Sequence, residues 1–160
     1  MRNHEIMTTV FGKLNLKDQA EILVLDAPGS FEPELAALEG VKVFQDAQAA
    51  TQVTFVLAFV TRLEEVTAAA QLVAEKTQGD AIVWLAYPKS TSKQYRCEFN
   101  RDTGWDALGQ AGFEPVRQVA IDADWSALRF RRVAFIKTMQ RREGMALSEQ
   151  GKARTKAQKA

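Results

Sequence analysis

The segment YPKSTSK, residues 87–93, gathers side chains that are well suited to hold an anion. It contains two lysines and three hydroxyl side chains, namely Lys89, Lys93, Ser90, Thr91 and Ser92. Ammonium and hydroxyl groups donate hydrogen bonds, which suits them to a phosphate or a carboxylate. The segment follows an apolar run, and open α/β sheets bind ligands beyond the carboxyl ends of their strands. We therefore predict an anion-binding loop here, and the simpler alternative is a solvated polar loop.

The loop DAPGSF, residues 26–31, is the second place where a ligand could bind. It follows the apolar run EILVL, so it should reach the same edge of the sheet as the first loop. Asp26, Gly29 and Ser30 could line a shared crevice there, and Arg101 begins a later segment close by. An exposed crevice that joins the two loops would favour a small-molecule site.

Most other catalytic chemistries lack their residues. The single histidine is His4, so neither a Ser-His-Asp triad nor a two-histidine metal site can form, and we identify no metal site and no catalytic residue. The single cysteine is Cys97, whose thiol pKa could be lowered by Lys93 and Arg96 nearby in the sequence. The simpler interpretation of Cys97 is a partly buried small residue. We lean against an enzyme.

Length and composition predict one globular domain. The chain has 160 residues, of which 46% are hydrophobic and 26% charged, enough for one core. We expect a flexible segment at residues 1–12, an α/β domain at 13–137 and a polar, basic, disordered tail at 138–160. No signal-peptide or membrane-spanning run is visible, and the lone cysteine suits a reducing compartment, so we expect a cytoplasmic protein with no membrane partner.

The charges are unevenly distributed along the chain. The last ten residues contain four cations and no acid, whereas the whole chain has 21 Lys and Arg against 20 Asp and Glu. The folded body is therefore net acidic, and we do not expect a nucleic-acid platform. We expect instead a small anionic ligand or a protein partner.

Strand and helix patterns alternate along the first two thirds of the chain. Apolar runs at residues 21–26, 41–46, 51–60 and 80–88 predict strands, and the last two are apolar on both faces, as in a parallel strand covered by helices. Residues 33–40 predict a short helix between the first two strands. Residues 61–79 predict a long helix with Thr61 and Glu64 in a capping box and with Leu63, Val66, Ala70 and Val73 on its buried face.

The C-terminal third has a different pattern. Asp102 could cap a short helix that buries Trp105 and Leu108 and ends at Gly112. Residues 113–122 and 125–136 alternate more strongly and predict an antiparallel hairpin at the edge of the sheet. A weaker candidate group lies at its turn: Asp122, Asp124, Trp125 and Arg129.

This order of elements resembles the C-terminal half of Rossmann-like methyltransferases, in which the last strand inserts beside the last parallel strand. The segments VLDAPGSF, GDAIVWLAYPK and RDTGWDALGQAGFEPVRQVAIDADWSALRFR also resemble an uncharacterised bacterial family, domain-of-unknown-function family 3052. The resemblance covers roughly residues 13–141. It implies a single three-layer Rossmann-like α/β domain with a mostly parallel sheet, and it brings no activity or site residue.

The methyltransferase resemblance can be tested at the first loop. Those enzymes follow the first strand with an acidic residue and alternating glycines, because the backbone must approach the cofactor. Asp26 stands where the acid would be, but Pro28 has no N–H to donate and Glu32 would repel an anion. Asp46 could bind ribose hydroxyls after the second strand. The sequence argues against cofactor binding in the usual manner, and we identify no cofactor.

Two hypotheses of function remain, and the sequence does not establish either. The first is a non-catalytic, methyltransferase-like module that binds a small anionic ligand or a protein partner. The second is a divergent transferase, or other small-molecule enzyme, with an atypical cofactor loop and a substrate held by Lys89 and Lys93. A self-associating structural protein is a third possibility if the strand in residues 125–136 has an unpaired edge.

Overall fold

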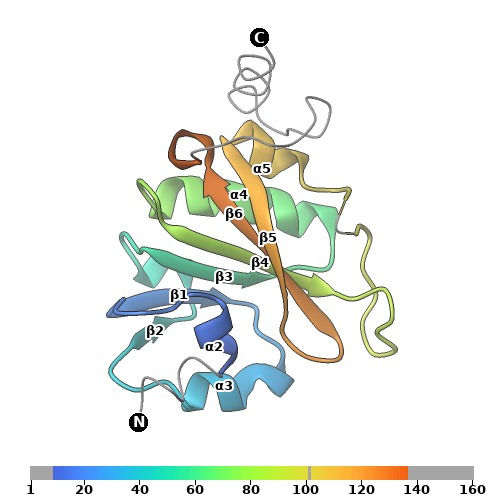
Figure 1. Cartoon of the computed structure of the whole chain (residues 1–160), viewed down its shortest axis with the longest axis horizontal. Coiled ribbons are helices and arrows are strands. Elements are labelled where there is room, and N and C mark those ends of the chain that lie inside the picture. The colour runs from blue at the N-terminus through green and yellow to red at the C-terminus, as the bar shows by residue number, and fades with distance from the viewer. Residues whose placement is uncertain (1–8, 101, 137–160) are drawn as a thin grey trace.

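A six-stranded sheet in the order β2-β1-β3-β4-β6-β5 forms the centre of the molecule (Figure 1). The computed structural model describes residues 9–100 and 102–136. The four parallel strands are β1 (Glu21–Leu25), β2 (Lys42–Phe44), β3 (Phe55–Phe59) and β4 (Ile82–Pro88). The antiparallel strands are β5 (Phe113–Ala120) and β6 (Trp125–Arg132). The expected mixed α/β sheet with an antiparallel C-terminal hairpin is confirmed.

Helices cover both faces of this sheet. The α-helices are α2 (Val10–Lys13), α3 (Glu32–Ala36), α4 (Leu63–Lys76) and α5 (Asp106–Gln110), and the 3-10 turns are η1 (Gly29–Phe31), η2 (Ala47–Ala49) and η3 (Val133–Phe135). One core cluster joins the sheet to α4 and α5, through residues such as Val73, Leu108 and Phe130. The other joins it to α2 and the α3 region, through Phe11, Phe31 and Trp84. The three layers follow from strands that are apolar on both faces.

The two central strands explain why the chain folds around them. All five residues of β3 are buried, and β4 is buried from Val83 to Pro88. β3 pairs with β1 on one side and with β4 on the other, as its continuous apolarity predicted. The ordered strand is shorter than the expected run of residues 51–60, because Thr54 and the residues before it lie outside the ladder.

Packed structure begins earlier than the expected start at residue 13. Phe11 lies in α2, has only 2% of its surface exposed and contacts the rings of Phe31 and Phe55. Leu14 is fully buried, and its carbonyl oxygen accepts a hydrogen bond of 2.8 Å from the indole nitrogen of Trp84. The segment around α2 is therefore part of the core. His4 and the C-terminal tail lie outside the described residues.

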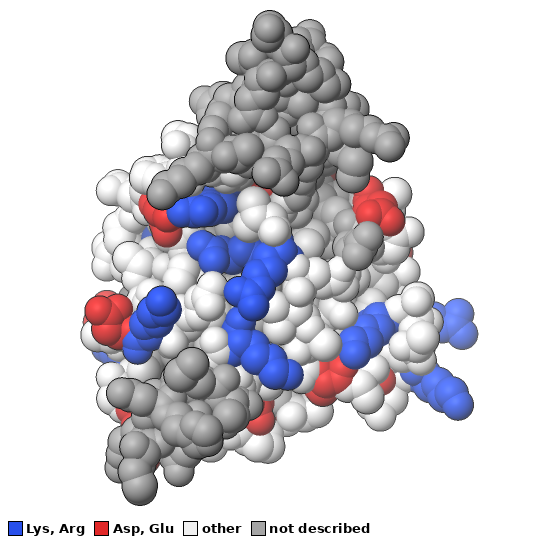
Figure 2. Space-filling model, in the orientation of Figure 1, with Lys and Arg blue, Asp and Glu red and all other residues white. Residues whose placement is uncertain are grey.

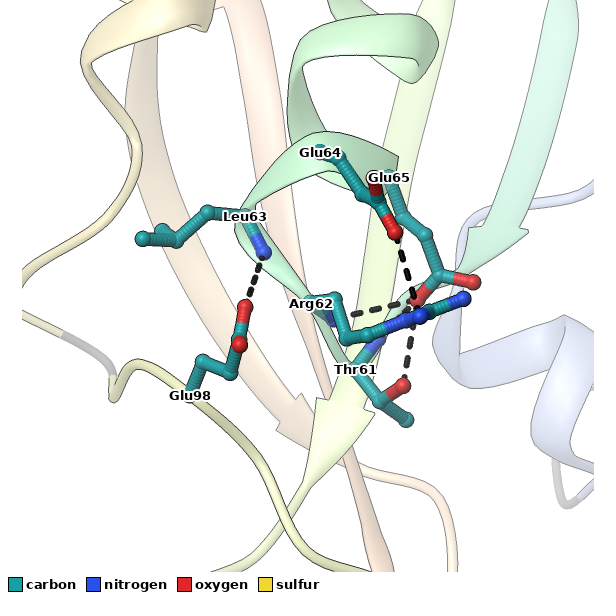
Figure 3. Close-up of polar contacts among 6 residues, drawn as sticks. All are labelled: Thr61, Arg62, Leu63, Glu64, Glu65 and Glu98. Carbon is teal, nitrogen blue, oxygen red and sulfur yellow. Dashed lines mark hydrogen bonds and ion pairs between the residues drawn. The ribbon is translucent and has the colours of Figure 1, made fainter.

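The start of α4 differs from the expected capping box by one residue. The N-cap is Arg62, and the carboxylate of Glu65, not Glu64, accepts from the backbone N–H groups of Thr61 (2.8 Å) and Arg62 (3.0 Å) (Figure 3). Glu64 is exposed and forms an ion pair with Arg62 at 3.1 Å. The box joins the N-cap to the third residue after it, so an N-cap at Arg62 in place of Thr61 gives the capping role to Glu65 and leaves Glu64 exposed.

Two further details of the helices correct the sequence interpretation. Leu63 was expected on the buried face of α4, but it is 46% exposed, and Ala69 is buried with Val66, Ala70 and Val73. Asp102 does not cap α5, which begins at Asp106 after a Trp105 N-cap without a side-chain hydrogen bond. Asn100 organises the preceding turn instead, since its side-chain oxygen accepts from the N–H groups of residues 102 and 103.

The C-terminal hairpin inserts its second strand into the sheet. β6 pairs with β4 and with β5, so β5 is the edge strand. The turn between them is held by Asp122, whose carboxylate accepts from the N–H groups of Asp124 (2.8 Å) and Trp125 (2.9 Å). Both edges of β6 are paired, which removes the sequence-based argument for self-association through that strand. In the described part of the chain, no helix has the length and apolarity to cross a membrane.

Candidate functional site

A pocket of about 940 Å³ opens at the carboxyl end of β4. The whole segment of residues 87–93 lines it, including the five residues expected to bind an anion: Lys89, Ser90, Thr91, Ser92 and Lys93. Later residues complete the lining: Tyr95, Arg96, Cys97, Phe99, Asn100, Asp102, Gln118 and Ser126. The structure therefore gathers the expected loop residues around one cavity of ligand size.

The Lys89–Lys93 loop is held in place by the hairpin turn. The N–H of Lys89 donates to the carbonyl oxygen of Asp124 at 2.7 Å, and the Ser92 hydroxyl donates to the Asp124 carboxylate at 2.8 Å. The same Ser92 oxygen accepts from the N–H of Tyr95 at 3.1 Å. Ser92 is therefore a structural residue of the loop. Ser90, Thr91 and Lys93 remain exposed, and Lys89 is half-buried.

The pocket's other walls are aromatic side chains with polar tips. The Tyr87 hydroxyl accepts a hydrogen bond of 3.0 Å from the side-chain amide of Gln118 on β5. Tyr95 packs against Trp125 with 4.9 Å between ring centroids, and Trp125 packs edge-on against Phe59 at 5.1 Å. This packing holds Tyr95 in place at the wall of the cavity.

The pocket has more cationic than anionic side chains among its described residues. Lys89, Lys93 and Arg96 line it, against the single carboxylate of Asp102. A guanidinium and two ammonium groups around a cavity attract phosphate or carboxylate. Sequence reasoning noted Arg96 only as a neighbour of Cys97. In the structure the chain turns at residues 89–92, and Arg96 lines the same pocket as Lys89 and Lys93.

The DAPGSF loop does not line this pocket. Asp26, Gly29 and Ser30 follow the end of β1, which is separated from β4 by β3, and none of them is among the lining residues. The expected crevice that would join the two loops is therefore not formed by these residues. Arg101 lies outside the described residues.

A backbone N–H group of the DAPGSF loop forms a hydrogen bond within the loop itself. The N–H of Phe31 donates to the carbonyl oxygen of Pro28 at 2.9 Å and closes η1, and the Phe31 ring is buried 5.0 Å from Phe59. Asp26, not Gly29, takes the left-handed conformation, with φ of 57°. A Cβ on Gly29 would meet no atom within 4 Å, so no close backbone approach requires glycine there. The loop's main role is to seat Phe31 and start α3.

Asp46 also has a local role. Its carboxylate accepts a hydrogen bond of 2.9 Å from the N–H of Gln48 and caps η2. A carboxylate that caps a turn can be explained without a ribose ligand.

Cys97 is not an activated thiol. Burial raises the pKa of the Cys97 thiol, and the nearby carboxylates of Glu98 and Glu65 add to that rise. The sequence-based expectation that Lys93 and Arg96 could lower this pKa is wrong, because burial and the two carboxylates determine the direction of the shift. In the part of the chain that the structure describes, no three His, Cys, Asp or Glu side chains form a group able to hold a metal ion.

Several pocket residues were not found by sequence reasoning. Tyr87 was quoted in the sequence, but Gln118 and Ser126 come from β5 and β6, about thirty to forty residues further along the chain. The register of β4, β6 and β5 places Tyr87, Ser126 and Gln118 on one face of the sheet. The pairing of β6 with β4, which brings that face to the pocket, was not specified by any local signal.

Comparison with solved structures identifies the fold. A SAM-dependent methyltransferase from Aquifex aeolicus aligns with a TM-score of 0.53 at 13% identity, over 78% of this chain and 88% of that chain. A possible exported protein from Bordetella parapertussis aligns with a TM-score of 0.53 at 10% identity, over 82% and 68% of the two chains. TrmN from Thermus thermophilus aligns with a TM-score of 0.50 at 10% identity, over 78% and 47%. The fold is therefore Rossmann-like and methyltransferase-like.

Comparison of sequences adds no family. No family model and no curated protein sequence matches the chain, so the resemblance to domain-of-unknown-function family 3052 is not confirmed. The residues after β1 also do not fit the usual mode of S-adenosylmethionine binding, since Pro28 has no N–H and the N–H of Phe31 is already bonded.

Proposed function

We propose that this protein is a methyltransferase-like α/β module that binds a small anionic ligand in the pocket at the end of β4. The observation that carries the proposal is the cavity of about 940 Å³ lined by Lys89, Lys93 and Arg96. Its position agrees with the general location of ligands in open α/β sheets, beyond the carboxyl ends of the strands.

The pocket supports binding better than it supports catalysis. Its polar groups are mainly lysines, an arginine, hydroxyls and the amides of Asn100 and Gln118, which can hold an anion through hydrogen bonds and charge, against the one carboxylate of Asp102. The thiol in the pocket has a raised pKa and so is a poor nucleophile near neutral pH. We therefore place a non-catalytic role first.

A divergent transferase is the second candidate. The fold shared with SAM-dependent methyltransferases supports it, although the loop after β1 departs from their cofactor-binding pattern. In this alternative the pocket holds a phosphorylated or carboxylated substrate, and the cofactor contacts differ from the usual ones.

A thermal-shift screen tests the proposal. The purified chain is screened against S-adenosylmethionine, nucleotides, dinucleotides, coenzyme A and simple phosphates, because a ligand that binds the native state raises Tm. A ligand of the pocket should lose its effect when Lys89→Ala is combined with Lys93→Ala. Thr67→Ala, on the exposed side of α4, serves as a control that should keep the response.

The screen also separates the two candidates. A response to S-adenosylmethionine that survives the double lysine variant would favour the transferase, with a cofactor site elsewhere. A response to anions without one to S-adenosylmethionine favours the binding module. If no compound shifts the Tm of the folded protein, the small-ligand proposal is wrong, and a protein partner becomes the hypothesis to test.

A further inference from the structure

Three arginines lie together on the side of the C-terminal hairpin that faces away from α4 and α5. Along β6, Leu128 and Phe130 point into the core beneath these helices, so the alternating Arg129 and Arg131 point to the opposite side. Arg117 on β5 is the direct cross-strand partner of Arg129. Figure 2 shows a run of Lys and Arg side chains across this part of the molecule.

Within residues 9–100 and 102–136, Arg131 forms an ion pair, and no ion pair is found for Arg117 or Arg129. Arg131 forms a two-pronged ion pair with Asp80, with Nε–Oδ1 and Nη2–Oδ2 distances of 2.7 Å, and Glu114 is its neighbour across the strands. Arg132 points to the other side, where it stacks on Phe113 and donates to the carbonyl oxygens of residues 77 and 79. Arg117 and Arg129 are thus left as a pair of like charges.

Arg129 is in an unfavourable environment as it stands. Its Nε is buried and has no hydrogen-bond partner among the described residues. Burial lowers the pKa of Arg129, and the positive charges of Arg131 and Arg117 lower it further, while the Asp80 carboxylate acts in the opposite direction and offsets part of this shift. An unpaired buried donor and two like charges directly opposite on neighbouring strands are both destabilising.

Packing alone does not account for this arrangement. Arg129 lies directly opposite Trp84 of β4, and the aliphatic part of an arginine side chain can cover apolar surface. That role explains one long side chain, but it gives no reason for a second arginine opposite the first. A bound anion that contacts the exposed part of the two guanidinium groups would offset the repulsion between them.

We propose that Arg117 and Arg129, with Arg131 at their side, bind a phosphate group of a ligand on this face of the sheet. Guanidinium groups present paired N–H donors whose geometry matches phosphate oxygens, and they keep their charge across the physiological pH range. The site is distinct from the pocket at Lys89–Lys93, so its ligand can bind independently of the proposed function.

The test measures binding of sodium pyrophosphate to the full chain by calorimetry and by the shift in Tm. Wild-type protein should bind pyrophosphate, and Arg129→Gln should weaken the affinity by about tenfold or more, since a hydrogen bond to a charged group is lost. Arg62→Gln removes the same charge from the exposed N-cap of α4 and should leave the affinity unchanged. Lys89→Ala with Lys93→Ala should also leave it unchanged.

Arg117→Gln provides a readout that a structural role would not move. It should raise the Tm of the ligand-free protein, because the repulsion is removed, and it should also weaken the response to pyrophosphate. A second arm uses a mixed-sequence single-stranded oligonucleotide. Binding that weakens with salt and with Arg129→Gln identifies a polynucleotide as the source of the phosphate, and binding of pyrophosphate alone identifies a small ligand.

The inference is overturned if folded Arg129→Gln binds these probes as tightly as wild type, or if wild type binds neither. A pyrophosphate response that disappears in the double lysine variant but persists in Arg129→Gln also overturns it, and in that case supports the pocket of the proposed function.

Discussion

The hydroxyl of Ser92 donates a hydrogen bond of 2.8 Å to the carboxylate of Asp124, which joins the pocket loop to the turn of the C-terminal hairpin. The two residues are 32 positions apart in the sequence, and the N–H of Lys89 donates to the backbone oxygen of the same Asp124. The position of the Lys89–Lys93 loop therefore depends on the hairpin.

Ser92→Ala should loosen this loop without unfolding the domain. The change removes the bond to Asp124 and the acceptor for the N–H of Tyr95, and each such bond contributes about 1 kcal/mol. The amides of Gln94 and Tyr95 should exchange with deuterium about fivefold faster, as measured by mass spectrometry or NMR. Thr91→Ala, at an exposed position of the same loop, should leave these rates unchanged; equal rates in both variants would contradict the assigned role of Ser92.

The two adjacent glutamates of α4 should differ in their effect on stability. Burial alone would raise the pKa of Glu65, but hydrogen bonds from Thr61 and Arg62 outweigh it and lower that pKa. Glu65→Ala should reduce the free energy of unfolding by about 1 kcal/mol, because two N–H groups at the helix start lose their acceptor. Glu64→Ala, at an exposed position, should change it by no more than about 0.5 kcal/mol. Urea denaturation measures the free energy of unfolding of both variants. A larger loss for Glu64→Ala than for Glu65→Ala would contradict the observed cap and favour the Thr61–Glu64 capping box expected from the sequence.

Glu98, which lies outside α4, also accepts a hydrogen bond from a backbone N–H at the start of this helix, that of Leu63. This N–H donates to the Glu98 carboxylate at 2.8 Å (Figure 3), so the segment that follows the Lys89–Lys93 loop contacts the start of α4. Glu98→Gln keeps a side-chain oxygen as acceptor and removes the charge.

Cys97 should react slowly with thiol reagents near neutral pH. Burial and the carboxylates of Glu98 and Glu65 raise its pKa, so folding favours the protonated thiol and the thiolate fraction is small. The rate of reaction with a disulfide reagent should keep rising with pH above the midpoint found for the urea-unfolded chain. Glu98→Gln should move the midpoint down. Because Cys97 is the only cysteine, the signal belongs to it alone, and a folded midpoint below the unfolded one would contradict the assignment.

The ion pair between Asp80 and Arg131 should add stability that acid removes. The Arg131 hydrogen bonds lower the pKa of Asp80 below its ordinary value of 3.8, so the contribution is complete above that value and is lost as the pH falls through the lower, folded pKa. Both side chains are about a third exposed, so Asp80→Asn should cost only about 0.5 kcal/mol at pH 7.

The pH dependence provides the check for this pair. The stability difference between wild type and Asp80→Asn, measured by denaturation, should shrink toward zero as the pH is lowered to about 2. Asp106→Asn, at an exposed position of the first turn of α5, serves as the matched control. A difference that stays constant with pH would show that the carboxylate charge is not responsible.

Local patterns were sufficient for the order and type of most elements. Apolarity on both faces predicted that the strands around residues 55–59 and 82–88 lie at the centre of a helix-covered sheet, because only a buried strand can be apolar on every residue. Alternation and the Asp122 turn predicted the hairpin. The anion-binding loop was predicted because lysine and hydroxyl side chains follow a strand end.

The tertiary structure decided which of these features meet. Insertion of β6 beside β4 brings Asp124 to Ser92 and Gln118 to Tyr87. The same pairing, with the shift in register between Pro115 and Arg117, places Arg117 opposite Arg129. On the other side of β4, the position of β3 between β1 and β4 separates the pocket from DAPGSF. Sequence alone determined the elements because their signals lie within a few residues. It did not determine these contacts, because strand order and register depend on the packing of the whole sheet.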